Sequence, residues 1–238
     1  MHNETLQYEA DGLTMLSRFY CDESAKGPRP GVLVFPEAFG LGEHALQKAE
    51  LLAHAGYAVL ASDLHGNAAM ISDFAVLMPL LAPMRTDPQH LRSRARAAMQ
   101  ALTARPEVDG TRIAAIGFCM GGTMALELAR SGAAIRAAVG FHSGLQTPAP
   151  QDAKNIKAKV LVCLGADDPL IPPEQRLDFE KEMRAGSVDW QMKLYGGVVH
   201  SFTNKAADER GQPQSMRYDA AAEARSWAEM LALFDEVF

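Results

Sequence analysis

Cys119 lies at the centre of a Gly-x-Cys-x-Gly pattern, from Gly117 to Gly121, which has the spacing of a nucleophile elbow. The residues before it, 113–116, are apolar and typical of a buried strand, and residues 123–132 have a helix-forming composition. Small residues two positions away on either side suit a sharp strand-to-helix turn, because the backbone brings them into close contact there. The start of the helix would favour a thiolate. The pattern predicts a reactive thiol; a buried structural cysteine is the alternative.

A thiol nucleophile needs a base, and the base needs an acidic group that fixes its tautomer. In proteins with this elbow, the order along the chain is nucleophile, acid, histidine. Downstream of Cys119, Asp167 and Asp168 follow a predicted strand, and His200 follows the last predicted strand. The order predicts His200 as the base, with a surface loop histidine as the alternative. Either aspartate fits as the acid, since one of them can serve as a turn or cap residue.

Strands and helices alternate along nearly the whole chain, which predicts a mostly parallel sheet with helices on both faces. In such sheets ligands bind beyond the carboxyl ends of the strands, where the candidate residues fall. Residues 63–87 are expected to form a loop and then short helices, and Arg92, Arg94 and Arg96 are expected on a solvated helix face. After an N-terminal hairpin, the sequence predicts strands over 31–35, 57–62, 135–141, 159–165 and 189–195, and helices over 44–55, 88–104, 174–185 and 216–238.

The composition is that of an ordinary globular protein. With 238 residues and 48% hydrophobic content, one α/β domain over residues 1–238 is expected. The net charge of −6 speaks against a nucleic-acid partner. The three cysteines, Cys21, Cys119 and Cys163, have no metal-like spacing and suggest a reducing compartment. The sequence shows no signal peptide and no membrane-spanning run, so a cytoplasmic protein is expected, whereas its oligomeric state is not indicated.

Four segments resemble motifs of the dienelactone hydrolase family, which has the α/β-hydrolase fold. They are PEAFG at 36–40, GFCMGG at 117–122, GADDPLIP at 165–172 and HSF at 200–202. Each motif alone is weak, but the combination is specific and spans most of the chain. The resemblance implies an α/β-hydrolase fold and the hydrolysis of a small ester or lactone, with no metal or organic cofactor.

The resemblance also selects between the two aspartates. Family members use a Cys-His-Asp triad, which maps to Cys119, His200 and Asp168. The aspartate follows from the family's spacing of a glycine, two residues, an aspartate and a proline four further on, as in Gly165, Asp168 and Pro172.

The resemblance assigns roles to the PEAFG segment as well. In the family, the glutamate of this motif approaches the cysteine and pairs with the resting thiol, which implies that Glu37 pairs with Cys119. A carboxylate in that place would keep the thiol neutral and poorly oxidisable until substrate arrives. The backbone N–H groups of Ala38 and Met120 are the expected oxyanion donors, and loss of one such donor typically costs about 2.7–4 kcal/mol in the barrier.

Substrate choice is less defined by the sequence. Family enzymes bind a substrate carboxylate with arginines, one of them four residues after the histidine, where this chain has Asn204. Arg85 and Arg210 are possible replacements, and Phe39 and Phe202 are further candidates for substrate contact. The departure at Asn204 makes a small ester or lactone other than a dienelactone nearly as plausible. The competing interpretation is a non-hydrolytic protein that uses its thiol for redox sensing or for holding a ligand.

Overall fold

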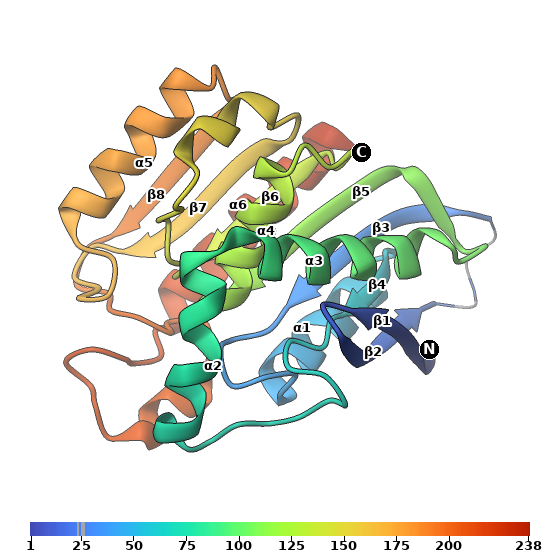
Figure 1. Ribbon diagram of the computed structural model, residues 1–238, viewed down its shortest axis with the longest axis horizontal. Coiled ribbons are helices and arrows are strands. Elements are labelled where there is room, and N and C mark those ends of the chain that lie inside the picture. The colour runs from blue at the N-terminus through green and yellow to red at the C-terminus, as the bar shows by residue number, and fades with distance from the viewer. Residues whose placement is uncertain (23, 25–26) are drawn as a thin grey trace.

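A computed structural model describes residues 1–22, 24 and 27–238. Within these residues, eight strands form one sheet in the order β1-β2-β4-β3-β5-β6-β7-β8 (Figure 1). The strand β2 pairs antiparallel with both of its neighbours, and all other neighbouring strands run parallel. The predicted fold class is confirmed. The strands are β1 (His2–Ala10), β2 (Leu13–Cys21), β3 (Arg29–Phe35), β4 (Ala58–Ala61), β5 (Val108–Phe118), β6 (Ala137–Phe141), β7 (Lys159–Gly165) and β8 (Trp190–Tyr195).

Helices cover both faces of the sheet, because the central strands are apolar on both sides. Two helices, α1 and α6, pack on one face, and α2 to α5 contribute to the core on the other face (Figure 1). Among the described residues, no helix combines the length and the apolar content that a membrane crossing needs. The helices are α1 (Glu43–His54), α2 (Phe74–Thr86), α3 (Pro88–Thr103), α4 (Met120–Arg130), α5 (Pro173–Ala185) and α6 (Ala220–Val237), with short 3-10 helices η1 (Pro150–Asn155) and η2 (Lys205–Arg210).

Most predicted helices agree with the structure to within one residue at each end, and the larger differences are at α2 and α6. Residues 74–86 form one helix, α2, although the sequence predicts short helices there and Pro79 and Pro83 lie inside it. The last helix begins four residues later than predicted, because Asp219 caps it by accepting a hydrogen bond from the Ala222 N–H at 2.8 Å.

The strand register brings the loops that follow β3, β5, β6 and β7 to one edge of the sheet. Phe35 on β3 lies opposite Gly117 on β5, and Phe118 lies opposite Phe141 on β6. Phe141 in turn lies opposite Cys163 on β7. Candidate residues from distant parts of the sequence therefore meet at this edge.

The predicted solvated face of α3 is wrong for two of its three arginines. Arg92 and Arg94 are buried, and only Arg96 is exposed. Arg92 donates to Glu127 on α4 at 2.8 Å and to Asp152 on η1 at 2.6 Å. A periodicity argument misses this arrangement, because the neutralising carboxylates come from other elements.

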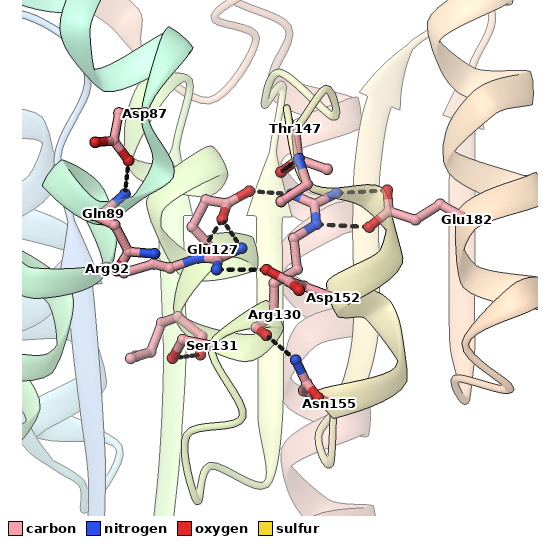
Figure 2. A network of polar contacts seen from close by, with 12 residues as sticks. Asp87, Gln89, Arg92, Glu127, Arg130, Ser131, Thr147, Asp152, Asn155 and Glu182 are labelled. Carbon is pink, nitrogen blue, oxygen red and sulfur yellow. Dashed lines mark hydrogen bonds and ion pairs between the residues drawn. The ribbon is translucent and has the colours of Figure 1, made fainter.

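A fully buried arginine connects these carboxylates to α5. Arg130 donates to Glu127 at 2.9 Å, and its Nε and Nη2 form a two-pronged contact with Glu182 at 2.7 and 2.8 Å (Figure 2). It also donates to the carbonyl oxygen of Leu145 at 2.9 Å. Through this network α4, which begins directly after Cys119, is tied to α5 and to the loop after β6.

We predict that replacing Arg130 by methionine lowers the free energy of unfolding by about 3–5 kcal/mol, because the buried Glu182 loses its arginine partner and Glu127 keeps only Arg92. Urea unfolding measures this change. Arg96→Met, on the exposed face of α3, is the control and should stay within about 0.5 kcal/mol of wild type. Equal effects of the two substitutions would show that the buried network is not what holds these helices.

Candidate active site

Cys119 occupies a strained turn between β5 and α4. Its φ is 53° and its ψ is −117°, and its N–H donates to the Phe141 carbonyl at 3.0 Å. A Cβ atom at Gly117 would lie 2.1 Å from the backbone of Gly121, and a Cβ at Gly121 would lie 2.2 Å from the Phe35 carbonyl oxygen. Only glycine fits at both places. The thiol is partly exposed at the start of α4.

His200 lies in the loop after β8 and is held by an acid from the loop after β7. Its Nδ1 lies 2.7 Å from Oδ2 of Asp168, and both side chains are almost fully buried. Asp168 Oδ1 accepts the Leu170 N–H at 2.8 Å, which fixes the carboxylate. Asp167 is exposed. The structure thus brings Asp168, and not Asp167, against the histidine.

The loop around His200 rests on buried aromatic side chains. The imidazole of His142 meets that of His200 edge to face, with ring centroids 5.0 Å apart, and its Nε2 is 2.8 Å from the Thr203 hydroxyl. Phe202 is fully buried between His142 and Tyr195. The prediction that Phe202 contacts substrate is therefore wrong. Phe202 packs in the core and supports the loop that carries His200. The sequence favours a hydrogen-bonded loop histidine at His142, with substrate contact as the alternative; its burial against His200 depends on contacts between distant segments.

The environment of His200 favours its protonated form. Burial lowers its pKa, but the charge of the nearby Cys119 sulfur and the hydrogen bond with Asp168 outweigh burial, so the pKa lies well above its ordinary value. Its other nitrogen, Nε2, is buried and makes no well-formed hydrogen bond with the described residues. The ring is thus oriented through Nδ1, with Nε2 left for proton exchange.

The predicted oxyanion donors come from two adjacent elements. Ala38 follows β3, whose last residue, Phe35, lies beside Gly117 at the end of β5. Met120 is the first residue of α4, so its N–H is one of those at a helix start that have no intrahelical acceptor. Ala38 and Met120 are both buried.

Glu37 is bound by two side chains from the segment after His200. Its Oε2 accepts from Asn204 Nδ2 at 2.7 Å and from Arg210 Nη2 at 3.2 Å. The guanidinium of Arg210 also lies over the ring of Phe39, at 4.6 Å from its centroid. The other carboxylate oxygen, Oε1, is buried and has no hydrogen-bond partner among the described residues.

The candidate residues divide between two cavities. Cys119 and His200 line a cavity of about 1010 Å³, together with the exposed Arg85. Glu37, Phe39 and Arg210 line a second cavity of about 430 Å³. In the described part of the chain, no three His, Cys, Asp or Glu side chains are arranged to hold a metal ion.

We predict that Asp168→Asn lowers the pKa of His200, because removal of the carboxylate charge removes a contribution that favours the imidazolium. An NMR titration of the imidazole measures the pKa. Asp167→Asn is the matched control, since that neighbouring side chain is exposed and should leave the titration unchanged. A His200 pKa that is the same in all three proteins would contradict the assignment of Asp168 as its partner.

Comparisons with known proteins include several members of one family. A dienelactone hydrolase-like promiscuous phosphotriesterase from metagenomic libraries is 47% identical, with a TM-score of 0.94 over 100% of this chain and 98% of that one. A candidate dienelactone hydrolase from Klebsiella pneumoniae is 25% identical, with a TM-score of 0.84 over 98% of each chain. A candidate carboxymethylenebutenolidase of Escherichia coli strain K12 is 29% identical over 90% of this chain and 79% of its own length.

The sequence profile of the dienelactone hydrolase family matches residues 18–238, nearly the whole chain. The strands β3 to β8, the turn at Cys119 and the loops that carry Asp168 and His200 lie within this match. The chain belongs to the dienelactone hydrolase family and is a hydrolase of the carboxylic ester class.

Proposed function

We propose that the chain hydrolyses small carboxylic esters or lactones through a Cys-His-Asp triad of Cys119, His200 and Asp168. The observation that carries this proposal is the 2.7 Å contact between Asp168 and His200, beside a cavity that His200 shares with Cys119. A base oriented by an acid, next to a thiol at a helix start, is the arrangement that nucleophilic catalysis requires.

In the first step, the Cys119 sulfur attacks the carbonyl carbon of the substrate. The thiol proton is held by His200 at Nε2, and Asp168 stabilises the resulting imidazolium. The carbonyl oxygen becomes an oxyanion, which accepts hydrogen bonds from the N–H groups of Ala38 and Met120. The positive end of α4 adds to this stabilisation.

The tetrahedral intermediate then breaks its C–O bond. His200 gives its proton to the departing alkoxide or enolate, and a thioester of Cys119 is left. Water attacks the thioester carbonyl while His200 accepts a proton from it, and breakage of the C–S bond releases the acid and restores the thiolate and imidazolium pair. The cycle consumes ester and water only. A thiolate suits esters with good leaving groups better than amides.

Glu37 is proposed to act on Cys119 between catalytic cycles, when the sulfur has taken its proton back from His200. The hydrogen bonds from Asn204 and Arg210 occupy one carboxylate oxygen, which leaves the buried Oε1 as the acceptor that we propose for the thiol proton. In the structure, Oε1 makes no hydrogen bond with Cys119. Because Asn204 and Arg210 both donate to Glu37, we propose that neither binds a substrate carboxylate. Arg85, exposed on the larger cavity, is the remaining candidate for that contact. We therefore place uncharged esters and lactones ahead of carboxylate-bearing ones.

The test is turnover of 4-nitrophenyl acetate and of a dienelactone at neutral pH. We expect Cys119→Ala to abolish multiple turnover of the simple ester, because the covalent step is lost, with a fall in kcat of about 10³-fold or more. Cys21→Ala is the matched control, since that thiol is buried on β2 and burial raises its pKa. Ester turnover that survives in Cys119→Ala would contradict the proposal.

The same experiment separates the hydrolase from the redox or ligand-holding thiol protein. A hydrolase releases many equivalents of 4-nitrophenolate for each chain, whereas a sensor thiol is modified once and stops. Release of one equivalent that Cys119→Ala removes would support the second interpretation.

A second activity, on phosphotriesters, is proposed from the 47% identity to the promiscuous phosphotriesterase. The Cys119 thiolate would attack phosphorus and displace the best leaving group, and water would then cleave the S–P bond. The oxyanion donors for a carbonyl oxygen would serve a phosphoryl oxygen equally well.

We expect wild-type protein to release more than one equivalent of 4-nitrophenolate from diethyl 4-nitrophenyl phosphate, at a rate below that of 4-nitrophenyl acetate. Cys119→Ala should abolish the release, since the S–P bond can no longer form. Absorbance of 4-nitrophenolate measures both reactions. Release that ends at one equivalent would show that the phosphorylated thiol is a dead end and would contradict this second activity.

A further inference from the structure

We infer that His65 is a positioning residue for the oxyanion hole: its imidazole holds the backbone of Ala38 so that the Ala38 N–H points at the developing oxyanion. The inference rests on the proposed function and deepens it. His65 lines neither of the two cavities described above, and its contact with the proposed oxyanion donor is the hydrogen bond with Ala38.

The contact between His65 and Ala38 is a direct hydrogen bond, and only one of its two atoms can be the donor. His65 Nε2 lies 2.7 Å from the Ala38 carbonyl oxygen. A carbonyl oxygen only accepts, so Nε2 must carry the proton. Burial lowers the pKa of this half-buried histidine, which favours the neutral ring protonated at Nε2.

The loop that carries His65 is itself fixed by one buried carboxylate. Asp63, which follows β4, is fully buried and accepts the N–H groups of His65 and Gly66 at one oxygen, at 3.0 and 3.1 Å. Its other oxygen accepts the N–H groups of Leu16 and Ala68, at 3.0 and 2.7 Å. Four backbone hydrogen bonds to one carboxylate leave the loop little freedom.

Arg94 of α3 anchors the same loop from the opposite direction. Its Nη1 donates to the Leu64 carbonyl at 2.6 Å, and its Nε and Nη2 donate to Asp11, at 3.0 and 2.8 Å. The residue before His65 is therefore attached to the helix layer. The buried Arg94 therefore fixes this loop, whereas a solvent-exposed arginine could not.

The loop after β4 also holds the next residues of the PEAFG segment. The Ile71 N–H donates to the Phe39 carbonyl at 2.9 Å. Gly40 lies so close to the loop that a Cβ atom would come within 2.3 Å of the Ala69 carbonyl oxygen. Two successive carbonyls, those of Ala38 and Phe39, are thus held by the same loop, which restricts rotation about Ala38.

The consequence for catalysis follows from geometry. The Ala38 N–H contributes to the barrier only if it points at the oxyanion, and a small displacement of a positioned group costs rate. Loss of the His65 donor leaves the Ala38 carbonyl without this partner, so the Ala38–Phe39 peptide can turn. The Ala38 Cα belongs to both peptides, so this movement also shifts the preceding peptide, which carries the Ala38 N–H. The thiol of Cys119 and its pairing with His200 do not depend on this contact.

The test compares His65→Met with His65→Gln, two side chains of the same length of which only glutamine carries an N–H donor. Single-turnover release of 4-nitrophenolate from 4-nitrophenyl acetate measures acylation, which needs the oxyanion hole. Alkylation by iodoacetamide measures the reactivity of Cys119, and it forms no oxyanion. His54→Met, on the exposed end of α1, controls for loss of a histidine.

We expect His65→Met to slow acylation about ten-fold or more while alkylation stays within about two-fold of wild type. His65→Gln should recover most of the acylation rate, and His54→Met should match wild type in both reactions. Unchanged acylation in His65→Met overturns the inference, as does equal slowing of acylation and alkylation, or a glutamine variant as slow as the methionine variant. If Cys119→Ala leaves turnover intact, the proposed function itself fails, whatever His65 does.

Discussion

The close approach of α4 to β3 is the constraint on which the rest of the site depends. Gly121 contacts the backbone at the end of β3, and a Cβ there would lie 2.2 Å from the Phe35 carbonyl oxygen. Because no side chain intervenes, the start of α4 and the segment after β3 share one corner of the sheet. That corner holds Cys119, Met120 and Ala38, so the thiol and both proposed oxyanion donors are positioned by the same packing contact.

Two groups of buried charged residues lie around this corner. Below the larger cavity, Arg130 neutralises Glu127 and Glu182 and ties α4 to α5 (Figure 2). Beside the elbow, Arg210 and Asn204 bind one oxygen of Glu37. A buried charge without a partner is costly, so each of these groups fixes the position of the other. The helices that surround the site are held by these pairs as well as by apolar packing.

The sequence predicted the fold well because its signals are local. Apolar runs, glycine turns and helix periodicity lie within single segments, and their alternation determines the α/β class. The elbow at Cys119 is local in the same sense. Prediction failed where a side chain meets a distant segment: Arg92 and Arg94 bind carboxylates from other elements, and Phe202 packs into the core and not against substrate.

By itself, the sequence determined the class of the sheet, the turn that presents Cys119, and the strand ends at which an acid and a histidine follow. The resemblance in the sequence had already selected Asp168, and the tertiary structure shows it facing His200 while Asp167 is exposed. Only the tertiary structure decided that Glu37 binds Asn204 and Arg210. It alone placed His65 against Ala38. The reason is physical: hydrogen bonds between segments tens of residues apart depend on register and packing, which no local pattern encodes.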